Sequence, residues 1–189
     1  MPILHVVVAS TRPSRKGPAV ADWFLERARA HGAFDVERMD LAEVALPLLD
    51  EPNHPRLRDY THEHTHRWSA TVARADAFVF VTPEYDFGAP ASLLNAMQYL
   101  VHEWAYKPLG FVSYGGVSAG LRGVQQTRQV ASALKLVAIP EAVSIPFFAH
   151  HLDEETGGFD PGEVQAKAAT VMLDELRRWA DALRPLRAE

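Results

Sequence analysis

The chain has 189 residues, of which 48% are hydrophobic and 23% charged, and its formal net charge is −5. This length predicts one domain spanning residues 1–189, and the apolar content excludes a disordered chain. The acidic balance argues against nonspecific nucleic-acid or membrane binding, and the absence of cysteine excludes disulfides and thiolate chemistry. We expect a cytoplasmic protein, because the sequence opens without the basic flank of a signal peptide and has no membrane-length apolar run.

Short runs rich in valine and phenylalanine indicate strands that are buried on both faces. Such runs lack the alternation of a strand with one solvated face, and they are typical of parallel sheets. The second run is weaker and more polar, as in an edge strand. The five expected strands cover residues 3–9, 34–39, 78–81, 109–113 and 137–145.

Helical periodicity fills the segments between the strands. A first helix is expected to begin at Gly17 and Pro18, because proline suits a first helical turn. Further helices are expected over residues 64–75, 91–104, 124–136 and 163–183. In the last of them the residues expected to face inward are Val164, Ala168, Val171, Met172, Leu176, Trp179 and Leu183.

The alternation of strands and helices predicts an α/β protein whose parallel sheet is covered on both faces. The segments over residues 46–59 and 150–162 are expected to be long surface loops. Ligands of such sheets bind beyond the carboxyl ends of the strands. The functional argument therefore concerns three loops, over residues 10–17, 82–90 and 113–123.

The first loop, S-T-R-P-S-R-K-G-P, combines hydroxyls and cations just before a helix. Helix N-termini offer unpaired N–H groups and partial positive charge, and arginine can grip a phosphate with two hydrogen bonds. The loop matches neither the Walker pattern nor G-x-G-x-x-G. It therefore indicates an anion site, and the alternative is a solvated basic loop.

The second loop, T-P-E-Y-D-F-G-A-P, is made rigid by two prolines. Its aromatic pair suits a planar ligand, and the alternative is that Tyr85 and Phe87 pack the loop onto the domain. Glu84 and Asp86 form a possible general acid/base pair, which no other hydrolytic feature supports. The third loop, S-Y-G-G-V-S-A-G, has glycines that allow close backbone approach to a ligand or serve only a tight turn.

Taken together, these loops resemble the NADPH-dependent FMN reductase family, which includes quinone-, chromate- and azo-reducing members. The family pattern G-S-x-R, then P-E-Y-N, then S-x-G-G reads here A-S-T-R from Ala9, P-E-Y-D from Pro83 and S-Y-G-G from Ser113. The stretch P-A-S-L-L-N-A from Pro90 also matches the family's helix start. The resemblance covers about residues 3 to 145. It implies a flavodoxin-like three-layer sandwich with a five-stranded parallel sheet of order 2-1-3-4-5.

The resemblance further implies that FMN is bound noncovalently and that NAD(P)H is the co-substrate. Hydride would pass from NAD(P)H through N5 of FMN to a quinone, azo, flavin or metal-oxyanion acceptor. A homodimer or homotetramer is implied as well. The phosphate contacts implied are Ser10, Arg12, Arg15, Gly17, Pro18, Ala19 and Val20. Isoalloxazine contacts implied are Pro83, Glu84, Tyr85 and Asp86, with Ser113, Gly115, Gly116 and Ser118 at the other edge of the ring.

Two positions depart from the family pattern: Ala9 replaces glycine, and Asp86 replaces asparagine. An ionised aspartate cannot donate from its side chain, so the swap is tolerated only if the backbone makes the flavin contact. We name no catalytic side chain, since the cofactor performs the hydride chemistry. The alternatives are a flavodoxin-type electron carrier and a noncatalytic FMN-binding module.

The histidine-rich stretch H-E-H-T-H from His62 is the one pattern that suggests a metal. Residues two apart do not share a helix face, so a solvated helix start is the favoured interpretation. No metal site is therefore predicted.

Overall fold

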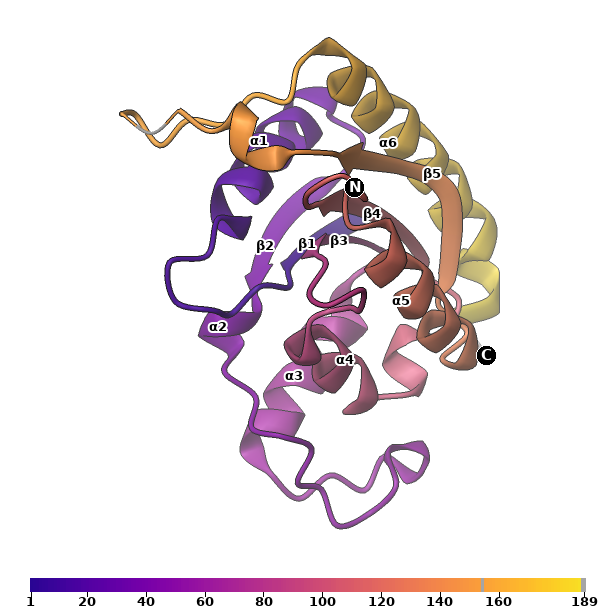
Figure 1. The fold of residues 1–189 in the computed structure, drawn as a ribbon. Coiled ribbons are helices and arrows are strands. Elements are labelled where there is room, and N and C mark those ends of the chain that lie inside the picture. Colours follow the sequence, from indigo (N-terminus) through magenta and orange to yellow (C-terminus); the bar gives the residue numbers. More distant parts are fainter. Residues whose placement is uncertain (154, 188–189) are drawn as a thin grey trace.

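The computed structural model describes residues 1–153 and 155–187 and shows a five-stranded parallel sheet between two layers of helices (Figure 1). The strands are β1 (Ile3–Val8), β2 (Asp35–Asp40), β3 (Ala77–Pro83), β4 (Pro108–Tyr114) and β5 (Val137–Ile145). Their spatial order is β2-β1-β3-β4-β5. The predicted flavodoxin-like order is thereby confirmed, and the polar second strand lies at an edge.

The α-helices in the described residues are α1 (Gly17–His31), α2 (Leu41–Val44), α3 (Glu63–Arg74), α4 (Ala91–Gln98), α5 (Leu121–Ala133) and α6 (Glu163–Leu183). The helix expected over residues 91–104 is shorter than predicted, because Trp104 belongs to a separate 3-10 turn, His102–Trp104. The helix expected over residues 124–136 begins earlier, at Leu121, and α2 was not predicted. No helix in this part of the chain is long and apolar enough to cross a membrane.

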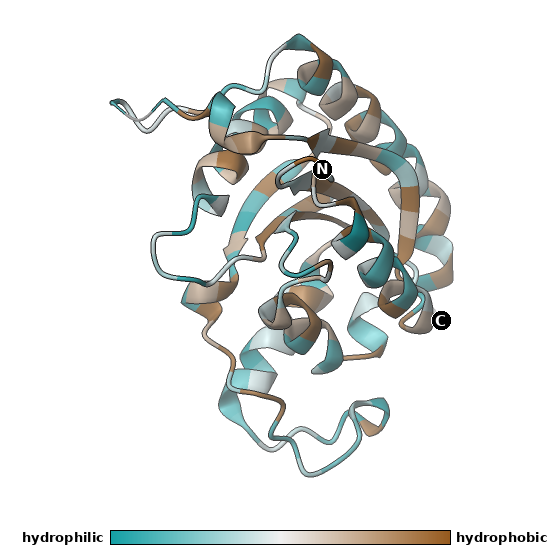
Figure 2. Cartoon of the chain, in the orientation of Figure 1, coloured by the Kyte–Doolittle hydropathy of each residue, from teal (hydrophilic) through white to brown (hydrophobic). Residues whose placement is uncertain are grey.

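Two hydrophobic layers lie on opposite faces of the sheet. One layer packs α1 and α6 against the sheet, and the other packs α3, α4 and α5. Val79 and Val81 of β3 face the first layer, whereas Phe78 and Phe80 face the second. Burial on both faces explains the unbroken apolar runs in the sequence. Figure 2 shows these strands as hydrophobic segments between helices whose outer sides are more polar.

Helix α6 approaches β4 closely because Gly110 has no side chain. A Cβ atom at Gly110 would lie 2.7 Å from the sulfur of Met172. The residues of α6 that are buried here are Ala169, Met172, Leu173, Leu176 and Ala180. The expected inward face was wrong at three positions, since Val164, Val171 and Trp179 are exposed. Met172 and Leu176 face Gly110, because the missing side chain leaves space for these larger residues in the close-packed core.

The pairing of β5, an edge strand, with β4 is interrupted near Pro140. The pairing of β4 with β5 shifts register between Leu109 and Phe111, which is where Pro140 lies opposite. Proline has no N–H to contribute to a ladder and is confined to sheet edges and bulges. Pro140 is exposed at this irregularity.

Candidate functional site

The three predicted loops meet at the carboxyl edge of the sheet, because β1, β3 and β4 are neighbours. The Oγ atom of Ser92, at the start of α4, donates to the carbonyl oxygen of Ala9 at 2.6 Å. The Oγ atom of Ser118 donates to Oε1 of Glu84 at 3.0 Å. The helix that follows the second loop is therefore bonded to the end of the first strand, and the second loop itself is bonded to the third loop.

The first loop is held in place by an ion pair between Arg15 and Asp40, which was not predicted from the sequence. Arg15 donates to the two carboxylate oxygens of Asp40 at 2.5 and 2.8 Å, and to the carbonyl oxygen of Ser10 at 2.6 Å. Burial favours the neutral form of Asp40, but hydrogen bonds from Arg15 and the Ala42 N–H outweigh it, so its pKa is lowered. Arg15 thus holds the loop, and its contact with phosphate stays a prediction. Arg12 is exposed.

The start of α1 has the features of an anion site. Its N-cap residue, Lys16, makes no side-chain cap, and its first turn contains no acidic residue. The Oγ atom of Ser10 is buried beside the Tyr114 hydroxyl, but no hydrogen bond of ordinary geometry joins it to a group in the described residues. A Cβ atom at Gly17 would lie 2.2 Å from that Oγ and 2.7 Å from the hydroxyl of Tyr114. An uncapped helix start beside an unsatisfied hydroxyl fits a phosphate group.

The second loop forms a tight reversal at residues 85–88. Tyr85 and Gly88 exchange two backbone hydrogen bonds, of 3.0 and 2.8 Å. The central residues, Asp86 and Phe87, both have positive φ, at 48° and 67°, which is the type I′ pattern. Aspartate and asparagine tolerate this conformation better than bulky residues do. The backbone therefore accommodates aspartate at the position where the family has asparagine.

Glu84 points away from the open side of this turn, toward α5. Its side chain is 7% exposed and pairs with the Arg122 guanidinium at 2.8 Å. Burial alone would raise the pKa of Glu84, but hydrogen bonds from Arg122 and Ser118 lower it. A carboxylate held in its ionised form by these partners is a poor proton carrier, so the geometry gives no support to an acid/base pair with Asp86.

The third loop uses its glycines in two different ways. A Cβ atom at Gly115 would lie 3.1 Å from the Gly120 nitrogen, whereas one at Gly116 would have open space around it. The carbonyl oxygens of Gly115 and Gly116 accept from the Phe148 and Phe147 N–H groups at 3.1 and 3.0 Å. Gly115 therefore serves the turn, whereas the space beside Gly116 is open, and its contact with a ligand stays a prediction.

Comparison with known proteins identifies the group to which these loops belong. A model of the NADPH-dependent FMN reductase family matches residues 1–150. The chain belongs to that family. It is an oxidoreductase with FMN as cofactor and NAD(P)H as co-substrate, which confirms the enzyme class and the cofactor predicted from the motifs.

Two relatives named NAD(P)H-dependent FMN reductase match most of the chain. C4B3.06c of Schizosaccharomyces pombe is 42% identical over 149 residues, which cover 77% of this chain and 74% of that protein. LOT6 of Saccharomyces cerevisiae is 33% identical over 154 residues, covering 75% and 80%. The structure of FerB, a flavoenzyme NAD(P)H:(acceptor) oxidoreductase from Paracoccus denitrificans, has a TM-score of 0.70 at 21% identity and covers 96% of this chain and 98% of that chain. That likeness shows the shared fold.

Several residues that shape the three loops were not among the predicted site residues. Asp40 anchors the first loop, Tyr114 lies against Gly17, and Arg122 and Gln126 of α5 hold the second loop. Tyr114 belongs to the third motif, but only its neighbours there were predicted to contact the ligand. Ser113, by contrast, is fully buried and its Oγ has no partner in the described residues.

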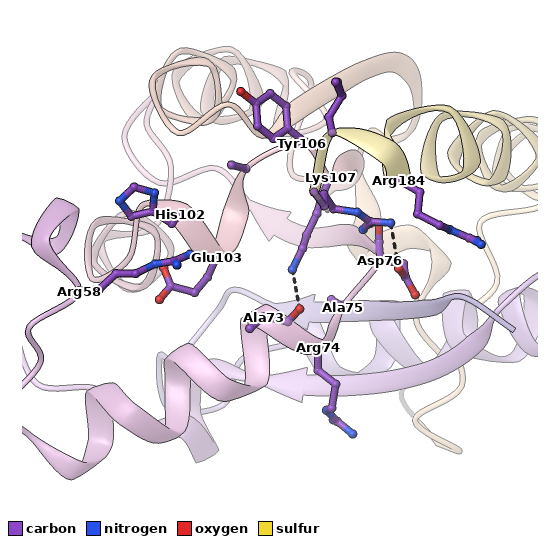
Figure 3. Close-up of a pocket in the computed structure, with 13 residues that line it drawn as sticks. Arg58, Ala73, Arg74, Ala75, Asp76, His102, Glu103, Tyr106, Lys107 and Arg184 are labelled. Carbon is purple, nitrogen blue, oxygen red and sulfur yellow. Dashed lines mark hydrogen bonds and ion pairs between the residues drawn. The ribbon is translucent and has the colours of Figure 1, made fainter. Parts of the chain in front are cut away.

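A cavity of about 630 Å³ lies at the opposite, amino edge of the sheet (Figure 3). Lys107 lines it, and its Nζ donates to the carbonyl oxygens of Val72 and Ala73 at 2.7 and 2.9 Å. Figure 3 shows Arg58 beside Glu103, whereas Arg74 and Arg184 are directed away from it. None of the three motif loops of the family contributes to it.

Proposed function

We propose that the three loops bind FMN and that the protein transfers electrons from NAD(P)H to a small organic acceptor. FMN, when bound, would supply the redox chemistry, in which two electrons and a proton leave NAD(P)H as a hydride and are passed on to the acceptor. Ser10, Arg12 and the start of α1 would hold its phosphate, and the turn at residues 85–88 would lie against its ring. Gly116 leaves the backbone of the third loop accessible to the far edge of the ring.

The acceptor is a planar organic molecule, such as a quinone, an azo compound or a flavin. Three apolar side chains are exposed around the site. Phe87 of the second loop is 71% exposed, Val117 of the third loop is 76% exposed, and Phe147, which follows β5, is 51% exposed. Phe147 is joined to the third loop through its hydrogen bond with Gly116. An exposed apolar surface beside a redox cofactor favours a ring system over a small metal oxyanion.

The observation that carries the proposal is the uncapped start of α1 next to the partnerless hydroxyl of Ser10. Arg12→Ala removes the exposed cation of this loop, and Arg29→Ala, at the other end of α1, is the matched control. Fluorescence titration should show FMN affinity falling about ten- to a hundredfold for Arg12→Ala and unchanged for Arg29→Ala. Equal affinity in both variants would remove Arg12 from the site.

Steady oxidation of NADPH or NADH in the presence of a quinone separates a reductase from an electron carrier. A carrier would keep its flavin and yet turn over negligibly. Turnover with ferricyanide but with no quinone or flavin would contradict the proposed acceptor class.

We also propose a homodimer or homotetramer in the cytoplasm. The exposed leucines Leu48 and Leu57 support association, because large apolar side chains in a surface loop gain from a covering partner. The cysteine-free composition suits a reducing compartment. Sedimentation of the FMN-loaded protein tests the assembly, and a monomer at micromolar concentration would contradict it.

A further inference from the structure

The turn that faces the flavin is bonded to α5 through the carboxylate of Glu84. Its Oε2 accepts the backbone N–H of Arg122 at 2.9 Å. Its Oε1 accepts the Arg122 guanidinium at 2.8 Å and the Ser118 hydroxyl at 3.0 Å. Both oxygens are thus engaged by the third loop and the helix that follows it.

Helix α5 has no cap of its own, which explains why this contact matters. Its N-cap residue is Gly120, in the left-handed conformation with φ 80°, and no acidic residue stands in its first turn. The N–H groups of a first helical turn require an acceptor, and a negative charge there is favourable. Glu84 provides both from the preceding loop. The start of α5 and the second loop therefore stabilise each other.

Arg122 completes the connection on its other side. Its guanidinium carbon lies 4.2 Å from the centroid of the Phe87 ring. The Ala89 N–H donates to Oε1 of Gln126 at 2.7 Å, one helical turn further along α5. Phe87 has a positive φ, which is unfavourable for an aromatic residue, so the surrounding contacts must maintain it.

We propose that Glu84 and Arg122 form a latch that keeps the turn at residues 85–88 in the shape that receives the flavin ring. Glu84 is then a positioning residue whose carboxylate acts through Arg122, in place of the direct ring contact that the family motif implies. The inference rests on the proposed function, because it assigns a role within the same FMN site. Tyr85 and Asp86 remain the residues that face the ring.

Amide exchange in the flavin-free protein tests the latch without reference to FMN. Glu84→Ala should accelerate exchange at the start of α5 and in the turn about tenfold, since it removes a helix cap. Glu84→Gln, which keeps an acceptor for the Arg122 N–H, should show a smaller acceleration. The matched control is Glu63→Ala, which removes an exposed glutamate that pairs with Arg67 at the start of α3. Unchanged exchange in Glu84→Ala would overturn the latch.

A double-mutant cycle on FMN affinity separates positioning from direct contact. Glu84→Ala should weaken FMN binding about tenfold, and Arg122→Ala should weaken it by a smaller factor, because the backbone N–H of residue 122 and the Ser118 hydroxyl still bind Glu84. The double variant should lose no more than Glu84→Ala alone. A loss equal to the product of the two single losses would mean that Glu84 acts on the flavin independently, and it would overturn the proposal. Unchanged affinity in both single variants would overturn it as well.

The two experiments also distinguish a failure of the latch from a failure of the proposed function. If the wild-type protein binds no FMN, the proposed function fails, while the exchange measurement still decides whether the latch exists. If Glu84→Ala does not fold, as judged by circular dichroism, Glu84→Gln and Arg122→Ala take its place in both experiments. Unchanged amide exchange, unchanged FMN affinity, or losses of affinity that multiply in the double variant would then overturn the proposal.

Discussion

The carboxyl and amino edges of the sheet differ in how their buried polar groups are hydrogen-bonded. At the carboxyl edge, the buried hydroxyls of Ser10 and Ser113 have no partner in the described residues. At the amino edge, Lys107 donates to two carbonyl oxygens and Arg187 pairs with Asp76 at 3.0 Å, although one oxygen of Glu103 is unsatisfied. The cavity of about 630 Å³ lies at the amino edge, whereas the hydroxyls of Ser10 and Ser113 lie beside the three motif loops, so cavity size alone does not point to the loops.

The largest expected effect concerns the ion pair under the first loop. Arg15→Met leaves the buried carboxylate of Asp40 with only Arg38 and the Ala42 N–H. Loss of one partner from a buried pair should lower the free energy of unfolding by about 3 kcal/mol, and FMN affinity should fall with it. Urea unfolding measures the first quantity. A change below about 0.5 kcal/mol would show that the carboxyl edge does not depend on this pair.

A smaller effect is expected from a methyl group at the start of α1. Gly17→Ala would place Cβ against the Ser10 and Tyr114 hydroxyls, and such overpacking costs about 2 kcal/mol. Gly116→Ala is the matched control, because nothing lies within 4 Å of its added Cβ. Urea unfolding of the two variants should therefore separate them. Equal stabilities would contradict the tight packing around Gly17.

The amino edge should respond to pH through Lys107. Burial lowers the pKa of Lys107 from 10.5 to about 7. Between these values the unfolded chain binds more protons than the folded one, so the unfolding free energy should rise with pH across this window. Lys107→Met should remove a slope on the order of 1 kcal/mol per pH unit. Lys167→Met, at an exposed position on α6, should leave the slope as it is.

The smallest effect on stability is expected at Asp86. Asp86→Asn should change the unfolding free energy by less than about 0.5 kcal/mol, because both residues accept the left-handed conformation. If the carboxylate lies beside the ring, its removal should nevertheless raise the midpoint potential of bound FMN, since a nearby negative charge disfavours an anionic reduced flavin. Spectroelectrochemical titration measures this shift. An unchanged potential would mean that the carboxylate points away from the ring.

The sequence predicts the strands well and the contacts between loops poorly. Phe78 to Val81 reads as a strand because burial on both faces leaves a local signature. The face of α6 was misjudged because Gly110, which lets Met172 and Leu176 come close to the sheet, lies on another element. The local sequence pattern shows which segments are buried, whereas a close approach between two elements depends on residues that are far apart in the sequence.

The same limit applies to the candidate site. The positions of Ser10, Tyr85 and Gly116 follow from motifs that come directly after strands. The orientation of Glu84 does not, because it depends on a helix whose own N-cap is a glycine. Asp40 was missed for a similar reason: it ends a polar edge strand and meets Arg15 only in the folded chain.

The irregularity at Pro140 affects the tendency of the protein to aggregate through its sheet edges. An open sheet margin invites another chain to extend it, which is a route to insoluble aggregates. A missing amide hydrogen and a displaced register make the β5 margin a poor template for such growth. The opposite margin, β2, carries Asp35, Glu37 and Arg38, so charge discourages stacking there. Both borders of the molecule are thereby protected against unwanted self-association through the backbone.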